Sequence, residues 1–413
     1  MTQLDIAERS LLDPIQGDAM LSDVMDWSSQ NSGSRNAAGL RAMRAKLANA
    51  FSRLPGDVSE TALPGQEVVN ASGEVETLPL QPALEVTVRP NAPIQIVLTG
   101  HYDTVFPADF HFQAPELIDA DTLHGPGTAD MKGGLRIMLE ALSAFEAHSD
   151  KDGVGYTVLL SPDEEIGSPG SATRLAELGR RSHVGLTFEP ALADGSLAGA
   201  RKGSGNFTLT VRGRAAHAGR EHHLGRNAIA ALSRFITRLD TLNGQREGVT
   251  FNIAKVDGGG ATNIVPELAI GRFNVRMVEP EDCAWIEREL AALVANVNAE
   301  DGLTAELSGG FSRPPKPMSP ANAQVFGWVK RAGADLGQHI QWAPSGGVCE
   351  GNNLWASGCP NVDTLGVRGG EIHSDREFMV VPSLVERAQL ATLILSRIAS
   401  GTYDARALKA MVA

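Results

Sequence analysis

Short apolar runs alternate with amphipathic stretches along most of the chain. Leu40, Met43, Leu47 and Phe51 recur at three- and four-residue intervals, which predicts one face of a helix over residues 37–54. The strands predicted in this first part are 84–88, 94–98, 156–160 and 183–188, and the helices are 20–28, 37–54, 133–145 and 172–178. This alternation favours an α/β fold with a mainly parallel sheet and helices on both of its faces.

The pattern changes near residue 203 and returns after residue 316. The intervening order of elements is strand, helix, two strands, helix and strand, which is typical of a ferredoxin-like α+β unit. The ranges in that order are 206–212, 227–242, 249–256, 267–275, 283–298 and 304–308. After a proline-rich linker, Arg313–Pro320, helix and strand patterns resume. We therefore predict one α/β domain built from residues 1–203 and 317–413, interrupted by a domain inserted at 204–316.

The charge balance limits the possible partners. With 36 basic and 49 acidic residues the net charge is −13, so phosphate backbones and anionic membranes would repel the chain. Three scattered cysteines, Cys283, Cys349 and Cys359, form neither a disulfide framework nor a zinc ribbon. The acidic first residues lack the apolar core of a secretory signal, and the apolar runs are strand-sized. We expect a cytoplasmic protein that binds neither nucleic acid nor membrane.

Five polar motifs follow apolar runs, at the positions where a parallel sheet presents the carboxyl ends of its strands and binds ligands. Each motif contributes a histidine or a carboxylate, and none contributes a cysteine. The motifs are GHYDTV at 100–105, GPGTADMKGG at 125–134, SPDEEIGSPGS at 161–171, FEP at 188–190 and GGEIHSDREF at 369–378. A set of imidazoles and carboxylates suits zinc, manganese or cobalt.

The residue types fit a paired metal site. Two dications about 3.5 Å apart need a bridging carboxylate, a terminal histidine and carboxylate for each metal, and a shared water that loses a proton easily. The residues that would supply these ligands are His101, Asp130, Glu165, Glu189 and His373. Glu164 then remains as a carboxylate able to take the water's proton and deliver it to a leaving amine.

Each of these residues also has an ordinary structural reading. His101 alone fits a strand-end turn, and Asp130 fits a cap of the helix predicted at 133–145. The adjacent Glu164 and Glu165 fit a solvated acidic pair at a helix N-terminus. Only the five motifs together favour the metal site over these readings.

The motifs GHYDTV, GTADMKGG, DEEIGS, FEP and HSDREF, in this order, resemble those of the two-zinc amidohydrolase and exopeptidase family. That family includes aminoacylase, acetylornithine deacetylase, succinyl-diaminopimelate desuccinylase and bacterial glutamate carboxypeptidase. The segments FPADFHF, TFEP and GRAAHAG are most similar to the glutamate carboxypeptidase branch. The resemblance implies two zinc ions per chain, with cobalt or manganese as alternatives, and an inserted domain that acts as a lid and in dimerisation.

Carried over position by position, the resemblance implies that Asp130 bridges the two metals. His101 and Glu189 would complete one metal site, and Glu165 and His373 the other.

The same resemblance assigns two supporting roles nearby. Glu164 would be the general base and acid, and Asp103 would accept the second N–H of His101 and fix its tautomer. The family also keeps a cis peptide bond after the bridging aspartate, which here is Asp130–Met131.

Three residues of the inserted domain match family positions that act on the substrate. His217 matches the histidine that polarises the scissile carbonyl, often from the other subunit of a dimer. Asn263 and Arg276 match substrate-holding positions, and an arginine suits a bidentate grip on a free α-carboxylate. Without a functional role, His217 would belong to a flexible surface loop and Arg276 would be an arginine at a strand edge.

Two departures affect the expected specificity. Where the glutamate carboxypeptidase branch has a GGGTDAA-like segment, this chain has SGGVCEGNN at 345–353, and Glu221-His222-His223 occupies a loop that is usually small and apolar. A glutamate preference therefore does not follow from the resemblance.

Three functions remain open from the sequence. The leading one is a homodimeric, metal-dependent hydrolase of an amide or peptide bond beside a free α-carboxylate, as in an N-acyl or N-aroyl amino acid or a dipeptide. A deacylase or desuccinylase of N-acyl diamino acids is the nearest alternative. A non-catalytic binding protein on the same fold should have lost Glu164 or a metal ligand, and all are retained.

Overall fold

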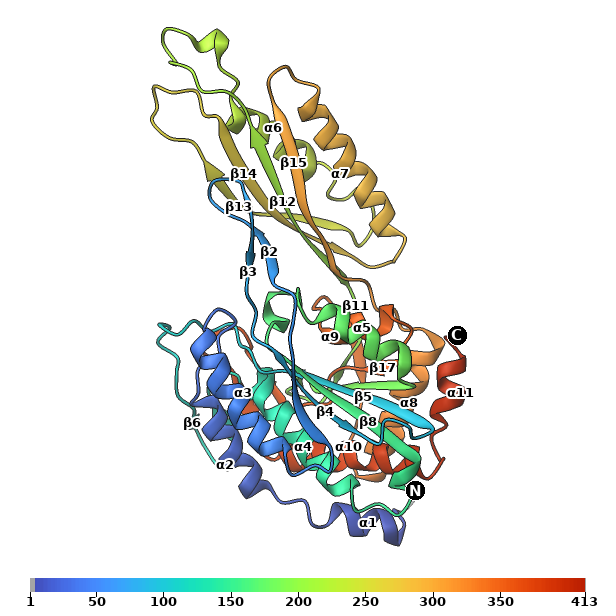
Figure 1. The fold of residues 1–413 in the computed structure, drawn as a ribbon. Coiled ribbons are helices and arrows are strands. Elements are labelled where there is room, and N and C mark those ends of the chain that lie inside the picture. Colours follow the sequence, from blue (N-terminus) through green and yellow to red (C-terminus); the bar gives the residue numbers. More distant parts are fainter. Residues whose placement is uncertain (1–3, 413) are drawn as a thin grey trace. The chain divides into compact units, whose positions relative to one another are not determined.

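The computed structural model describes residues 4–412 and divides them into two compact units (Figure 1). The first unit contains residues 1–64, 80–200 and 317–413, and the second contains 65–79 and 201–316, apart from the few terminal residues outside the described range. The fold is mixed α/β.

A six-stranded sheet forms the centre of the first unit, in the order β1-β4-β8-β5-β9-β17. Its strands are β1 (Asp57–Thr61), β4 (Ala83–Val88), β5 (Ile94–His101), β8 (Val154–Ser161), β9 (Val184–Thr187) and β17 (Asn361–Val362). The pairs β8–β5, β5–β9 and β9–β17 are parallel, whereas β1–β4 and β4–β8 are antiparallel. The carboxyl ends of β5, β8 and β9 therefore meet at one edge.

Helices cover both faces of this sheet, and alternate residues of β5 show why. Ile96 and Leu98 belong to the larger core, with the helices α4 and α10, whereas Val97 belongs to a smaller core with Leu175 of α5. The helices of the unit are α1 (Ile6–Leu12), α2 (Gly17–Ser28), α3 (Ala37–Phe51), α4 (Gly133–Phe145), α5 (Ala172–Arg181), α8 (Pro320–Asp335), α9 (Glu350–Ala356), α10 (Ser383–Ala399) and α11 (Ala405–Ala410).

Smaller sheets complete the first unit. One has the order β10-β18-β19-β7-β6, and β11 pairs with β16. These strands are β6 (Glu116–Leu117), β7 (Thr122–His124), β10 (Ala191–Leu192), β11 (Leu197–Arg201), β16 (Trp342–Ser345), β18 (Arg368–Gly370) and β19 (Phe378–Val380). Short helical turns lie at Thr128–Lys132, Lys151–Gly153 and Glu164–Ile166, with another at His222–Leu224 in the second unit.

The second unit has an antiparallel sheet in the order β13-β14-β12-β15. Its elements are β12 (Gly203–Arg212), α6 (Ala228–Asp240), β13 (Thr250–Gly258), β14 (Leu268–Met277), α7 (Asp282–Asn298) and β15 (Thr304–Arg313). This is the strand and helix order of a ferredoxin-like unit. Its own core joins Phe235 of α6 and Leu290 of α7 to Phe273 of the sheet.

A hairpin of β2 (Gln66–Val69) and β3 (Val75–Leu78) belongs to the second unit although it comes from the first part of the chain. Arg272 donates a hydrogen bond to the Val69 carbonyl at 2.9 Å, and Arg212 donates one to the Gly73 carbonyl at 2.8 Å. The backbone of the hairpin is thus fixed by side chains of the sheet.

Local sequence explains where several helices begin. Ser319 accepts a hydrogen bond from the Asn322 N–H at 3.1 Å, and Pro320 occupies the first turn of α8. Asn227 caps α6 in the same way through the Ala230 N–H at 2.9 Å. Both helices therefore start at residues that satisfy otherwise unpaired backbone amides.

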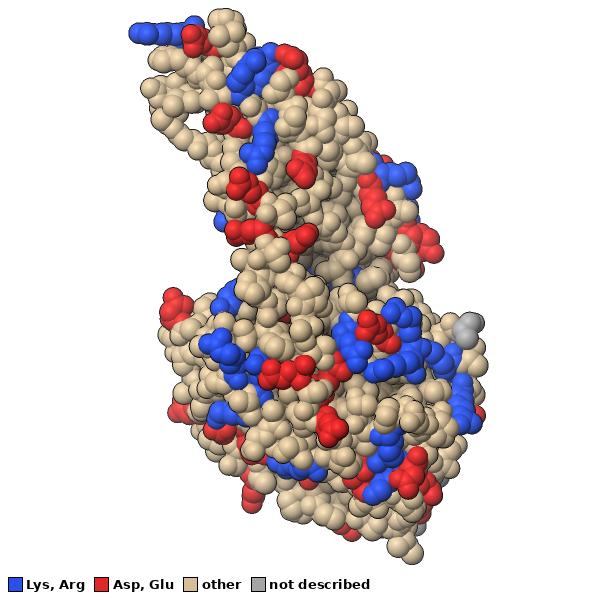
Figure 2. All heavy atoms as spheres, in the orientation of Figure 1, with Lys and Arg blue, Asp and Glu red and all other residues tan. Residues whose placement is uncertain are grey.

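The described residues contain no helix that meets the length and apolarity needed to cross a bilayer. Figure 2 shows acidic and basic side chains interspersed over the visible face of each unit. On that face the net charge of −13 is therefore not gathered in a single acidic patch.

Candidate metal centre

The sheet edge of the first unit brings three of the five sequence motifs together. His101 is the last residue of β5, and it pairs in register with Ser161 at the end of β8. Glu164 and Glu165 follow β8 in a single helical turn, and Glu189 follows β9. Because β8, β5 and β9 are parallel neighbours, the side chains after their carboxyl ends converge.

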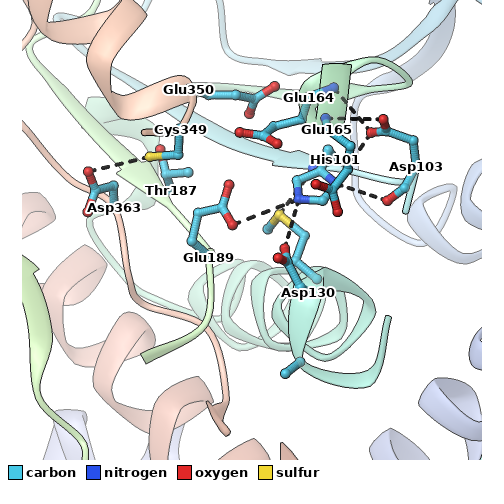
Figure 3. Close-up of polar contacts among 12 residues, drawn as sticks. His101, Asp103, Asp130, Glu164, Glu165, Thr187, Glu189, Cys349, Glu350 and Asp363 are labelled. Atoms are coloured by element: carbon cyan, nitrogen blue, oxygen red, sulfur yellow. Dashed lines mark hydrogen bonds and ion pairs between the residues drawn. The ribbon is translucent and has the colours of Figure 1, made fainter. Parts of the chain in front are cut away.

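Asp130 lies between the two histidines. Its Oδ1 is 3.1 Å from Nε2 of His101, and its Oδ2 is 3.2 Å from Nε2 of His373, which lies in the β18–β19 loop. His373 Nε2 is also 3.2 Å from Oε2 of Glu165, and His101 Nε2 is 3.8 Å from Oε2 of Glu189. Figure 3 shows His101, Asp130, Glu165 and Glu189 around one small space. Each oxygen of Asp130 thus faces a different imidazole, and each imidazole has a second carboxylate.

The donor atoms are close enough to hold metal ions. One atom each from His101, Asp130 and Glu165 lies within 4.8 Å of the others, and the same holds for His101, Glu164 and Glu189. Imidazole nitrogens and carboxylate oxygens, without thiolate, are ligands that zinc, manganese and cobalt accept. The residues present fit a pair of dications, and Glu164 lies within the same group of atoms.

The electrostatics of the site show an excess of negative charge. Burial and the nearby Asp130 raise the pKa of Glu165 to about 8, and burial raises the pKa of Glu189 to about 7. Hydrogen bonds to Asp130 and Glu165 raise the pKa of His373 to about 11. Burial opposes ionisation of Asp130, but the two histidines outweigh it and lower the pKa of that carboxyl. Bound cations would take the place of the protons on these groups.

Asp103 holds His101 and both glutamates in place. Its carboxylate accepts hydrogen bonds from the N–H groups of Glu164 and Glu165, both at 3.2 Å, and from the Ser34 hydroxyl at 2.7 Å. Nδ1 of His101 is 3.0 Å from the Asp103 carbonyl and 3.3 Å from its Oδ1. A proton on Nδ1 satisfies both oxygens and leaves Nε2 free to face Asp130 (Figure 3).

The backbone around Asp130 has the special geometry that the resemblance implies. The Asp130–Met131 peptide bond is cis, and Gly127 has a φ of 71°. Addition of a Cβ at Gly134, at the start of α4, would bring it to 1.9 Å from the Phe188 carbonyl oxygen. The motif GTADMKGG thus lets the Asp130 loop pack closely against the strand end before Glu189.

Sequence reasoning missed two buried carboxyl groups beside the site. Glu350, at the start of α9, accepts a hydrogen bond from the Ser161 hydroxyl, and burial raises its pKa to about 8. Glu377 lies in the GGEIHSDREF motif and accepts backbone hydrogen bonds from the Asp130 loop. Glu377 belongs to the GGEIHSDREF motif and Glu350 to the SGGVCEGNN segment. No periodic pattern in the sequence indicates that either carboxyl is buried.

The structure places His217, Asn263 and Arg276 in the second unit. His217 and Asn263 lie side by side, because the Ala218 N–H donates to the Asn263 carbonyl at 2.9 Å. Nδ1 of His217 accepts hydrogen bonds from the N–H groups of Gly219 at 3.1 Å and Arg220 at 3.2 Å. A neutral His217 therefore carries its proton on Nε2, as a donor.

Arg276 lies on β14, and its Nε donates to the Asn274 side chain at 3.0 Å. Burial lowers the pKa of its guanidinium, and the neighbouring Arg313 adds to the effect. Among the described residues, no hydrogen-bond acceptor is found for its buried Nη1.

A sequence model of peptidase family M20/M25/M40 matches residues 97–397. Carboxypeptidase G2 from Pseudomonas sp. (strain RS-16) is 26% identical over 314 residues, which cover 74% of each chain. A succinyl-diaminopimelate desuccinylase from Nitrosospira multiformis is 28% identical over 319 residues, or 73% of this chain and 82% of that one. The structure of a tripeptidase from Staphylococcus aureus is similar with a TM-score of 0.70 and 25% identity, covering 94% of this chain and 99% of that chain.

Proposed function

The chain belongs to peptidase family M20/M25/M40, whose members hydrolyse amide or peptide bonds, and we propose that its substrate bond lies next to a free α-carboxylate. The substrate class is an N-acyl or N-aroyl amino acid or a dipeptide. The observation that supports a metal-dependent reaction is the position of Asp130, with one oxygen facing His101 and the other facing His373. A carboxylate so placed is suited to bridge two cations.

In this proposal Asp130 would be shared between two divalent metal ions, for which zinc is the leading candidate. His101 and Glu189 would hold one ion, and Glu165 and His373 would hold the other. When bound, the ions supply Lewis acidity for the carbonyl and lower the pKa of a water molecule.

Glu164 transfers a proton from the attacking water to the leaving nitrogen. Its backbone N–H is fixed on Asp103, and its side chain lies beside the donor atoms of His101 and Glu189. It accepts a proton as the water oxygen attacks the carbonyl carbon, and it donates that proton to the nitrogen as the C–N bond breaks. The products are a carboxylic acid and an amine, so atoms and protons balance.

The second unit supplies the residues that act on the substrate itself. The Nε2 proton of His217 is a donor for the carbonyl oxygen as negative charge develops on it. Arg276 binds the free α-carboxylate, and its buried Nη1, for which no acceptor is found among the described residues, supports this role. Asn263 lies next to His217 and also holds the substrate. We propose that the chain is a homodimer in which His217 serves the partner's site.

A second candidate substrate class is an N-acyl diamino acid. The similarity to the Nitrosospira desuccinylase supports it, at nearly the same identity as the similarity to carboxypeptidase G2. The two candidates differ in whether the released amine carries a second charged group.

The test is hydrolysis of a panel of N-acyl and N-aroyl amino acids, dipeptides and N-succinyl diamino acids by zinc-loaded protein. Amine release is measured before and after chelation. Cleavage of α-carboxylate substrates that chelation abolishes is the expected result, and restriction to succinyl diamino acids would favour the second candidate. Two bound metals without cleavage of any member would contradict both and favour a ligand-binding role.

A further inference from the structure

Glu377 is a fully buried glutamate to which the reaction above gives no task. It lies four residues after His373, at the end of the β18–β19 loop. Its carbonyl accepts a hydrogen bond from the Gly125 N–H at 3.1 Å. Its carboxylate accepts three more: Oε2 from Gly127 at 3.1 Å, and Oε1 from Ala129 and Asp130, both at 2.9 Å. One residue thus binds four amides of the loop that carries Asp130.

These amides need an acceptor from outside their own loop. The N–H groups of Ala129 and Asp130 precede the first turn of α4 and have no helical carbonyl to bind. Buried amides without an acceptor are costly, so the loop geometry depends on the carboxylate that reaches them. Thr128 adds local bonds to the Gly125 carbonyl, from its hydroxyl at 2.8 Å and from its N–H at 3.2 Å.

Glu377 also connects two of the proposed metal ligands. Its main chain continues the loop of His373, whereas its side chain fixes the backbone of Asp130. Oδ2 of Asp130 and Nε2 of His373 are 3.2 Å apart, so a small shift of either loop would change the space between them. Metal sites tolerate only small deviations of their ligands.

We propose that Glu377 is a positioning residue that sets Asp130 and His373 for metal binding without touching a metal itself. The proposal rests on the proposed function, because it takes these two residues as ligands. A glutamine at position 377 keeps the side-chain length but offers one acceptor oxygen and an NH₂ group. At least one of the three amides would then face a donor instead of an acceptor. An aspartate keeps the charge but is one methylene too short to reach all three.

The experiment compares Glu377→Gln and Glu377→Asp with the wild-type protein and with Glu386→Gln. Glu386 is the matched control because it is a carboxylate of the same unit that lies on α10 and pairs with the side chain of Arg368 on β18, rather than with the amides of the Asp130 loop. Metal-free protein is titrated with Zn²⁺ by calorimetry without substrate. Far-UV circular dichroism and thermal unfolding of the metal-free form report on the fold.

We expect two zinc sites in the wild type and in the control, and binding at least about tenfold weaker in both Glu377 variants at an unchanged circular dichroism spectrum. Wild-type zinc affinity in either folded variant overturns the proposal, even if its unfolding temperature falls, because that is the result of a purely structural role. If Glu377→Gln does not fold, Glu377→Asp decides by the same criterion. A wild-type chain that binds no zinc would instead refute the proposed function.

Discussion

Two adjacent glutamates differ in what surrounds their carboxylates. Glu165 lies within 3.2 Å of His373, whereas Glu164 groups with His101 and Glu189 on the other side of the site. Both backbone amides bind the same Asp103 carboxylate, so one side chain fixes the turn from which the two glutamates diverge. Adjacent positions in the sequence thus reach opposite sides of one centre, which allows one glutamate to bind metal and the other to transfer protons.

Replacement of Glu164 by glutamine separates these two tasks. The amide cannot accept the water's proton, so we expect kcat to fall by about 10²–10⁴-fold. Both zinc ions should remain, because the five proposed ligands are unchanged. Single-turnover kinetics and metal analysis of the same sample measure the two effects. Near-normal turnover would show that Glu164 is not the proton carrier, and loss of one metal would show that it is a ligand.

At the residue scale, sequence motifs predicted which side chains meet but not what holds them. His101, Asp130, Glu165, Glu189 and His373 were identifiable because their residue types follow strand ends in fixed motifs, and the structure brings them together. Glu350 and Glu377 could not be predicted in the same way, because what marks them is burial. Their burial arises from the packing of segments far apart in the chain. A single sequence does not show that proximity.

At the scale of elements, an ion pair connects the central sheet to α4. Arg89, which follows β4 and has a φ of 47°, donates two hydrogen bonds to Glu146 at 2.9 and 2.7 Å. Its Nε donates to the Val154 carbonyl at 2.7 Å, and Tyr156 donates to Glu146 at 2.9 Å. Glu146 is the C-cap of α4, so the pair fixes the end of the helix that begins beside the candidate metal centre.

Replacement of Glu146 by glutamine should destabilise the first unit in a pH-dependent way. Burial opposes ionisation of Glu146, but the bonds from Arg89 and Tyr156 outweigh it and lower its pKa below the ordinary value of 4.5. The ionised Glu146 carboxylate therefore stabilises the folded state above pH 4.5, and this stabilisation is lost as the pH falls through the lower pKa of the folded state. We expect a loss of about 1–3 kcal/mol at pH 7 that shrinks in more acidic solution.

Urea unfolding of the wild type and of Glu146→Gln between pH 7 and pH 3 measures this difference. Glu177→Gln is the matched control, because Glu177 forms an exposed ion pair with Arg174 on α5 and should change stability little. A difference between wild type and Glu146→Gln that does not depend on pH would mean that packing, not charge, accounts for the effect.

Element prediction succeeded where a periodic pattern was long. The helix predicted at 133–145 has those bounds in α4, because its apolar residues are buried along its whole length. The hairpin β2–β3 was missed because its strands have four residues each and none of these residues is buried, so no apolar alternation marks them. The two- and three-residue strands of the sheet around His373 are likewise too short for any period to appear.

At the scale of the whole molecule, the proposed reaction needs residues from both units. The proposed proton carrier and metal ligands lie in the first unit, and His217 and Arg276 lie in the second. Each unit has its own hydrophobic core, so each keeps its residues in place independently. If the chain is a homodimer in which His217 serves the partner's site, two chains with defects in different units should complement each other.

Mixing Glu164→Ala with His217→Ala, each inactive alone, tests this arrangement. After subunit exchange, half of the dimers are mixed, and one of the two sites in each mixed dimer has both an intact Glu164 and an intact His217. Activity should therefore rise to about a quarter of the wild-type value at the same chain concentration, because the two kinds of chain assort at random in a two-fold dimer. Exchange is verified by mass spectrometry of one isotope-labelled variant. Mixed dimers without recovered activity would place His217 in the site of its own chain, since every site would then contain one of the two defects.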